Sequence, residues 1–271
     1  MIQKKIENKI RTNYRYFDLI RELAVTDFKL KYQGSLIGYA WSLVKPLAMF
    51  GVLYLVFTVF VRIGSGIQHY ALYLLLGIVL WTYFADATNT TMKAVADKGD
   101  MMRKVYFPRI TIIIAASISS AITLLLNLIV VFIFIILARI VPGWNALLFI
   151  PLLIELFILC LGIAFITSAM FVKYRDVGHI WEVLLQLLFY ASAIIYPLQI
   201  VPIRYQKFIL LNPITQIVQD ARYLLVTKET ITAESVLKMP LQFVPYIITI
   251  LIVVIGFIYF ERSSKNFAEE A

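Results

Sequence analysis

The sequence predicts an all-α protein that crosses a membrane six times, and three observations carry that prediction. Hydrophobic residues make up 61% of the 271 residues and charged residues only 15%. Mean hydropathy is +0.85. Soluble domains are about 45–50% apolar and about 25% charged, and a domain of this size cannot hide such an excess in its core. Finally, apolar segments long enough to span a bilayer recur along the chain.

The six segments differ in clarity. Residues 110–138 contain no Asp, Glu, Lys or Arg and form the clearest span. The fifth segment is interrupted by Pro197 and Pro202, and irregular backbone at membrane depth persists only where protein or a water-filled cavity covers it. We therefore expect a split fifth span followed by short helices that re-enter the outer leaflet. The expected spans are about 40–61, 66–88, 110–138, 146–172, 182–197 and 240–260.

Charge predicts the orientation of these spans. Six spans place both termini on one side of the membrane. If that side is the cytoplasm, the internal segments carry 18 of the 25 lysine and arginine residues, as the positive-inside rule requires. The same bias accounts for the net charge of +9, so no nucleic-acid partner is expected. These internal segments are 1–45, 89–109, 173–182 and 261–271.

The segment 14–32 has the pattern of an amphipathic helix lying in the headgroup plane. Its apolar residues recur at spacings of three and four, with charged residues opposite. Asp27 falls on the apolar side, so we expect it to have a partner. An ordinary juxtamembrane helix has the same pattern and remains the alternative.

Two cytoplasmic connections also carry helix signals. Asn89, Thr90 or Thr91 can cap a short helix that runs through Lys98. Asp176 can cap a second short helix that leads into the fifth span. Such helices suit a docking surface for another protein, but an interfacial belt of aromatic and basic residues is equally consistent with them.

Several kinds of chemistry are absent from the sequence. There is no phosphate-binding loop, no zinc-protease motif and no nucleophile-elbow motif. Cys160 is the only cysteine, which excludes a disulfide framework and a cysteine-based metal site. We therefore expect no catalytic residues, no metal and no cofactor of its own. The ionisable residues near the membrane, Lys45, Asp86 and Glu155, are functional candidates by their position.

Four stretches in order resemble the polysaccharide-exporting permeases of the type 2 (ABC-2) class of ABC transporters. The first is 23–41, ending at Pro46-Leu47, and the second is 105–109. The third is 171–177, and the fourth joins Tyr196-Pro197 to Asn212-Pro213. The resemblance is collinear from about residue 14 to 262, which is nearly the whole chain.

This resemblance implies half of a transporter: two copies pair and dock two separate subunits that bind ATP and Mg²⁺. The cargo would be a lipid-linked O-antigen, capsule-type polysaccharide or teichoic acid, exported across the bacterial plasma membrane. It implies a cytoplasmic amphipathic segment 1–35, a transmembrane domain 36–262 and a cytoplasmic tail 263–271. Coupling helices map to about 90–98 and 174–182, and re-entrant helices to 198–223. The expected ATPase-coupling residues are Thr91, Lys93, Asp97, Lys98, Tyr174, Arg175 and Asp176.

The chemistry of such a cargo suggests further residues. Its anionic head would be attracted to Arg15, Lys29 and Lys31, at about 1 kcal/mol for each basic residue near the interface. Its sugar rings would stack on aromatic side chains, although many aromatics in a membrane protein simply face lipid. The candidate path residues are Tyr39, Trp41, Phe50, Tyr54 and Phe57 on the first span and Phe189, Tyr190 and Tyr196 on the fifth.

Three other functions remain open at this stage. An ABC-2 permease for a drug or small lipid would have the same helical frame. A glycosyl- or phosphotransferase acting on a polyprenyl carrier would need an acidic metal-binding cluster, and Asp97 and Asp100 are too few to form one. A purely structural membrane scaffold is the weakest of the three.

Overall fold

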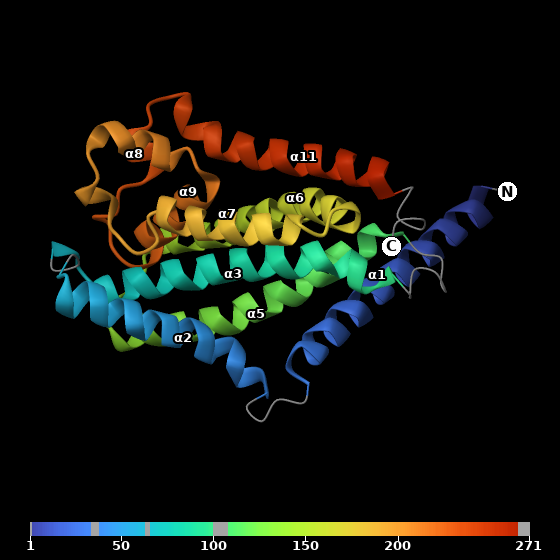
Figure 1. Ribbon diagram of the computed structural model, residues 1–271, viewed down its shortest axis with the longest axis horizontal. Coiled ribbons are helices and arrows are strands. Elements are labelled where there is room, and N and C mark those ends of the chain that lie inside the picture. The colour runs from blue at the N-terminus through green and yellow to red at the C-terminus, as the bar shows by residue number, and fades with distance from the viewer. Residues whose placement is uncertain (1, 34–37, 63–65, 100–107, 265–271) are drawn as a thin grey trace.

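The computed structural model describes residues 2–33, 38–62, 66–99 and 108–264, and the regular structure in those ranges is helical throughout (Figure 1). Five helical segments are long and apolar enough to cross a membrane, and they coincide with five of the six predicted spans. They are α2 (Trp41–Tyr54) with η2 (Leu55–Phe60), α3 (Tyr70–Asp97), α5 (Ile110–Leu137), η4 (Trp144–Leu148) with α6 (Phe149–Lys173), and η6 (Leu241–Phe243) with α11 (Val244–Ser264).

The remaining predicted span corresponds to a shorter apolar helix, α7 (Val177–Ala191). It ends six residues before Pro197, at a turn in which Ala193 has a φ of 50°. Four short helices follow in the order η5 (Leu198–Ile200), α8 (Ile203–Leu210), α9 (Pro213–Leu225) and α10 (Ala233–Val236). In Figure 1 they gather at the end of the bundle opposite the two termini.

The prolines in this region begin helices. Pro197 and Pro202 occupy the N-cap positions of η5 and α8, and Pro213 is the first residue of α9. Proline suits the first turn of a helix because the amide hydrogen it lacks has no partner there. The Asn212 side chain completes the α9 cap by accepting a hydrogen bond from the Ile214 amide.

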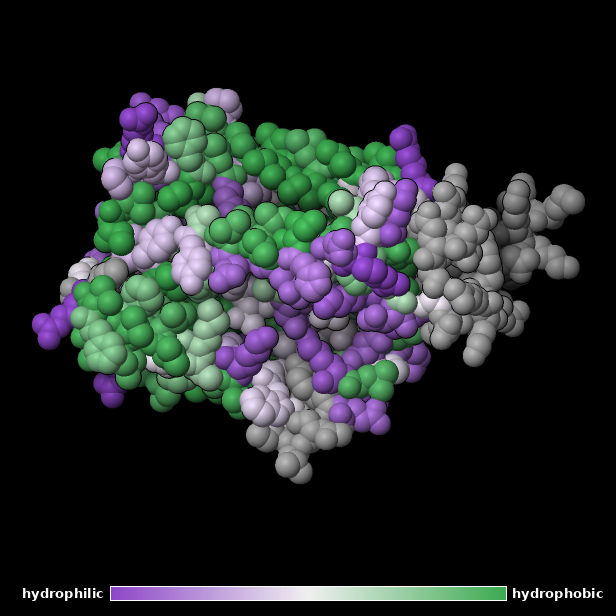
Figure 2. Space-filling model, in the orientation of Figure 1, coloured by the Kyte–Doolittle hydropathy of each residue, from purple (hydrophilic) through white to green (hydrophobic). Residues whose placement is uncertain are grey.

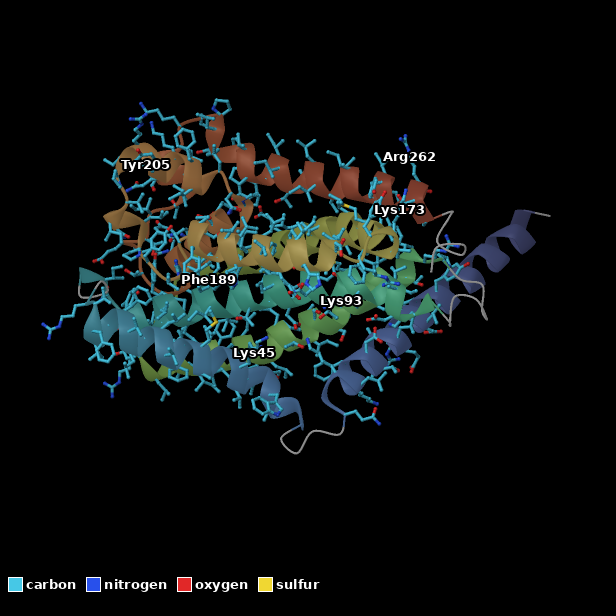
Figure 3. All side chains as sticks on the ribbon, in the orientation of Figure 1. Lys45, Lys93, Lys173, Phe189, Tyr205 and Arg262 are labelled. Carbon is cyan, nitrogen blue, oxygen red and sulfur yellow. The ribbon has the colours of Figure 1, made fainter. Side chains whose placement is uncertain are left out.

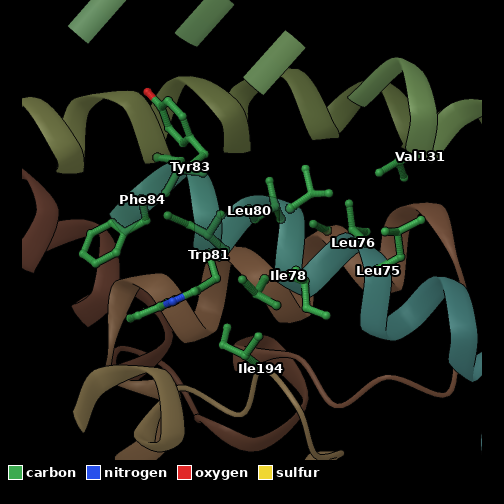
Figure 4. Packing of buried hydrophobic residues seen from close by; sticks show 14 of the residues in the cluster. Leu75, Leu76, Ile78, Leu80, Trp81, Tyr83, Phe84, Val131 and Ile194 are labelled. Carbon is green, nitrogen blue, oxygen red and sulfur yellow. The ribbon is translucent and has the colours of Figure 1, made fainter. Parts of the chain in front are cut away.

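Helix α3 is the centre of the molecule. It is apolar on nearly every side, as a helix surrounded by others must be, and it packs against α2, α5, α6, α7 and α9. Figure 4 shows how its side chains point outwards in several directions, with Val131 of α5 on one side and Ile194 on another. The other spans are therefore arranged around α3.

Helices α6 and α11 pack with their backbones in close approach. A Cβ on Gly256 would lie 2.4 Å from the carbonyl oxygen of Gly162, and a Cβ on Gly162 would lie 2.8 Å from the Cα of Val253. Both positions therefore require glycine, as is common where membrane helices associate through small residues.

Helix α1 (Ile2–Tyr32) is longer than the predicted 14–32 helix. Its C-terminal part packs against α5, with Ala24 buried and Phe17 exposed. Its N-terminal part projects beyond the bundle in Figure 1.

The two short helices expected in the cytoplasmic connections are not separate elements. Helix α3 continues without a break to Asp97. The hydroxyl of Thr91, one of the expected caps, donates to the Ala87 carbonyl four residues earlier, as a threonine inside a helix can. Residues 177–182 are the first turns of α7, and Asp176 occupies its N-cap position without making a side-chain cap. Both corrections extend a span towards the end of the bundle that carries the termini.

Candidate functional site

A stripe of polar side chains runs along one face of α3. Thr82, Asp86, Asn89 and Lys93 are spaced by four, three and four residues, so they lie on the same side of the helix. Thr82, Asp86 and Asn89 are partly exposed and Lys93 is exposed, whereas most of α3 is buried. We call these four residues the α3 stripe.

The α3 stripe forms the floor of a groove, which we call the α3 groove. Helices α2 and α7 both pack against α3, and α7 is tied to it where the Trp181 indole donates to the Thr88 hydroxyl at 3.1 Å. Figure 2 shows polar side chains gathered between the apolar surfaces of these two helices. Figure 3 places Lys45 of α2, Lys93 of α3 and Phe189 of α7 around this region.

A cavity of about 270 Å³ opens at the α1 side of the groove, between the end of α1 and helices α2, α3 and α5. Its polar lining includes two lysines and an aspartate, Lys31, Lys45 and Asp86. Ser120 and Thr123 also line it, and the hydroxyl of each is buried without a hydrogen-bond partner. Buried polar groups are normally paired, so these hydroxyls are available to a polar ligand.

Two ion pairs hold α1 against α3. The Lys31 ammonium lies 2.5 Å from the Asp86 carboxylate, and the Lys98 ammonium lies 2.5 Å from the Asp27 carboxylate. The second pair confirms that Asp27 needs a partner on its apolar face. In the first, Asp86 offsets the charge of Lys31, so this lysine is not a free cation for an anionic head.

The other residues expected to receive such a head are placed differently. Lys29 is exposed on α1. Lys45, which was not among the residues expected to receive the head, is exposed at the cavity rim. The side chain of Arg15 lies outside the described residues.

The predicted aromatic residues fall into two groups on opposite sides of α3. On α2, the rings of Phe50 and Tyr54 lie 5.6 Å apart, and Phe57 is partly buried against the core. Trp41, 48% exposed, lines the cavity. The side chain of Tyr39 lies outside the described residues.

On the α7 side, the Phe189 ring lies 5.5 Å from that of Trp81 on α3 and 5.4 Å from that of Tyr190. The Tyr196 hydroxyl donates to the Tyr190 carbonyl at 2.9 Å. The structure therefore brings the α7 aromatics together on α3 and leaves the α2 aromatics across the groove from them.

The predicted coupling residues lie near the end of the bundle that carries the termini, but they differ in accessibility. Lys93 and Asp97 are exposed, whereas Thr91 is buried with its hydroxyl on the Ala87 carbonyl. Thr91 thus cannot touch a docked protein, and Lys98 is engaged with Asp27.

The α6–α7 turn presents the remaining coupling residues. Tyr174, Arg175 and Asp176 are all exposed there. The Arg175 guanidinium lies 5.1 Å from the centre of the Phe171 ring, which fixes its direction.

Sequence reasoning missed two features. One is the α3 stripe, which the spacing of polar residues inside an otherwise apolar span could have indicated. The other is Arg222, which lies in the expected re-entrant segment 198–223 and is fully buried on α9. Its guanidinium donates to the carbonyls of Tyr73, Ala193 and Ile194 at 2.6–2.9 Å. Within the described ranges, no group of three or more His, Cys, Asp or Glu residues could hold a metal ion.

Residues 18–226 match the family model described as ABC-2 type transporter. The chain belongs to this family. As an ABC-2 transporter chain with five helices long and apolar enough to cross a membrane in its described residues, it is a multi-pass membrane protein. It is 26% identical over 263 residues to the O-antigen export system permease protein RfbA of Klebsiella pneumoniae, covering 96% of this chain and 98% of the relative.

Two further relatives of this ABC-2 chain come from other bacteria. A protein of the same description from Myxococcus xanthus is 27% identical over 189 residues, 70% of this chain and 72% of the relative. The polysialic acid transport protein KpsM of Escherichia coli is 25% identical over 213 residues, 75% of this chain and 79% of the relative.

Proposed function

We propose that this chain is the membrane subunit of an ATP-driven exporter that moves a lipid-linked cell-surface polysaccharide or teichoic acid out of the bacterial cytoplasm. The observation that carries the proposal is the nearly full-length similarity to an O-antigen export permease. A small-drug permease would share the family but not this particular relative. The chain itself holds no nucleotide motif, so hydrolysis of ATP belongs to a partner subunit.

The proposed assembly contains two copies of the chain and two ATPase subunits, with α7 and its following turn as a sixth span and both termini in the cytoplasm. Only 6% of the residues in the most apolar stretch of α2 and η2 are buried. This exposed surface supports the proposal because a second copy could pack against it. A groove on one surface also needs a second wall before it can enclose a polymer.

In the proposed path, the α3 grooves of the two copies face each other, and the polymer passes between them. Thr82 and Asn89 can exchange hydrogen bonds with sugar hydroxyls, and Asn89 has a buried amide oxygen without a partner. Trp41 and Tyr190 present exposed rings on which sugars can stack. Lys45 and Lys93 supply the positive charge that attracts an anionic head.

The proposed coupling surface consists of Lys93 and Asp97 at the end of α3, with Tyr174, Arg175 and Asp176 in the α6–α7 turn. A docked ATPase that moves this turn would move α7 directly, because the turn continues into the helix. Helix α7 would then be part of both the path and the coupling surface.

The test is export by the complex reconstituted in vesicles with its ATPase partner and a lipid-linked polymer. Replacing Thr82 and Asn89 with Leu removes the neutral hydrogen-bonding groups of the α3 stripe, so polymer export should fall at least tenfold while ATP hydrolysis continues. The matched control is Leu125→Ala on α5, which is 58% exposed and lies outside the groove cavity. Normal export by the double variant would exclude this path, and export of lipid-free drugs but no polymer would overturn the proposed function.

A further inference from the structure

A second, larger cavity of about 940 Å³ lies at the end of the bundle opposite the termini, between α6, α9, α10 and α11. It shares no lining residue with the cavity of the α3 groove. Three carboxylates from three helices line it: Glu155 of α6, Asp220 of α9 and Glu234 of α10. Nothing in the proposed export path uses them.

The cavity has an excess of negative charge. The one lysine in its lining, Lys228, lies 4.1 Å from the centre of the Tyr223 ring. Across the described part of the chain, none of the three carboxylates forms an ion pair. Burial raises the pKa of Asp220 to about 6, and nearby Glu234 adds to the increase. A cation in the cavity would reduce the repulsion between these carboxylates.

A buried glutamine beneath the carboxylates gives an independent indication of a ligand. Gln216 is 0% exposed, and its amide nitrogen donates to the Asp220 carboxylate at 2.7 Å and to the Tyr246 hydroxyl at 3.1 Å. Both partners line the cavity, so the amide head lies against the cavity wall. The amide oxygen has no hydrogen-bond partner. It is an acceptor, so an occupant that donates hydrogen bonds would satisfy it.

We infer that this cavity binds a primary ammonium group. An ammonium supplies a positive charge for the carboxylates and three N–H donors for the carboxylate and amide oxygens. The volume is that of a small-molecule site and is far larger than a bare metal ion needs. The rings of Tyr246 and Phe243 in the lining can hold a cation over their faces. The inference does not depend on the proposed cargo.

Two sources could supply the ammonium: a phospholipid with an ethanolamine head, or a soluble amine. The lipid source has support from the surrounding surface. Ile154 of α6 and Ile247 of α11 are exposed apolar residues directly beside the cavity-lining Glu155 and Tyr246. Exposed apolar side chains continue along α11 from there, so acyl chains would have a surface to cover.

The first experiment measures thermal unfolding of the delipidated full-length protein in detergent during titration with ethanolamine, choline or ethylene glycol. Choline keeps the charge without N–H donors, and ethylene glycol keeps the donors without the charge. Ethanolamine should raise the melting temperature saturably, at concentrations at least tenfold lower than either analogue. Equal responses to all three compounds, or a larger response to magnesium chloride at the same ionic strength, would overturn the inference.

Variants then place the binding in this cavity. Glu155→Gln together with Glu234→Gln should weaken the ethanolamine response at least tenfold, since charge-assisted hydrogen bonds are lost. Glu234→Gln alone changes an exposed rim residue, so it tests the site even if the double variant does not fold, and a threefold or larger loss is expected. The control is Glu229→Gln, an exposed glutamate at the same end but outside the lining. Equal affinity in Glu234→Gln and the control would exclude this cavity.

A further experiment distinguishes the two sources of the ammonium group, a phospholipid and a soluble amine. Native mass spectrometry of protein from mixed micelles should show phosphatidylethanolamine retained over phosphatidylcholine by the wild-type chain and not by Glu155→Gln with Glu234→Gln. Binding of free ethanolamine without retained lipid would assign the same site to a soluble amine. Absence of both would overturn the proposal while leaving polymer export untouched, so its failure is distinguishable from that of the proposed function.

Discussion

Helices α2 and α3 lie side by side, and the less apolar of the two is the more buried. In the most apolar stretch of α2 and η2, the mean hydropathy is 2.0 and 6% of the residues are buried. In the most apolar stretch of α3, the mean hydropathy is 1.5 and 78% of the residues are buried. In a soluble domain the order would be reversed. Lipid tails are as apolar as leucine, so apolarity does not draw a helix into the centre of a bundle. Hydropathy here indicates which helix can face lipid, while fit and hydrogen bonding decide which is enclosed.

The largest expected effect comes from the same substitution on the two helices. Leu76 of α3 is 0% exposed and Leu55 of η2 is 47% exposed. Leu76→Ala leaves a cavity among packed side chains and should lower the free energy of unfolding by about 3 kcal/mol, whereas Leu55→Ala should change it by about 0.5 kcal/mol or less. Reversible unfolding in mixed micelles measures both.

The outcome also tells what covers α2. Equal losses in the isolated chain would contradict the contrast between the helices. A loss in Leu55→Ala that appears only at concentrations where the chain dimerises would place the second copy on α2.

A glycine pair gives a smaller effect. A Cβ on Gly77 of α3 would lie 2.2 Å from Nη2 of Arg222, whereas a Cβ on Gly51 of α2 would meet nothing within 4 Å. Gly77→Ala must push the guanidinium away from its three carbonyl acceptors, so we expect a loss of about 1–3 kcal/mol. Gly51→Ala should be neutral or slightly stabilising, because alanine favours the helix. Thermal unfolding of the two single variants compares them, and equal midpoints would show that Arg222 can move without cost.

The smallest effect concerns the ion pair between α1 and α3. Both side chains of Asp27–Lys98 are about one-fifth exposed, so a double-mutant cycle with Asp27→Asn and Lys98→Met should give a coupling of about 0.5–1 kcal/mol. The comparison pair is His179–Glu182, which is 4.0 Å apart and largely exposed and should show no measurable coupling. Coupling that is absent from both would mean that α1 is held by apolar packing alone.

The features that the sequence predicted correctly all have a local signal. Five spans were predictable because each is a long apolar run with at most one or two charges, and the pairing of Asp27 was predictable because a charge on an apolar face needs a partner. The helices after Pro197, Pro202 and Pro213 follow from the place of proline in a first turn.

The features that were missed depend on contacts between distant residues. Nothing around Arg222 indicates that carbonyls of Tyr73 and Ile194 will surround it, because these lie 149 and 28 residues away. Asn89, Thr90 and Thr91 resembled helix caps, but α3 continues past them to Asp97, where it packs against α5 and α7. The α3 stripe was visible in the sequence, but its role as a groove floor required knowing that α2 and α7 flank it.

The two ion pairs between α1 and α3 also bear on the order in which the chain is made. Synthesis proceeds from the N-terminus, so α3 enters the membrane before α5, α6 and α9, which later surround it. A carboxylate such as Asp86 costs about 3 kcal/mol at the centre of an inserting helix. Its partner Lys31 is made 55 residues earlier, and Asp27 likewise precedes Lys98. Asp86 and Lys98 can therefore be neutralised as soon as they emerge, while the apolar surface of α3 remains in lipid until the later helices arrive.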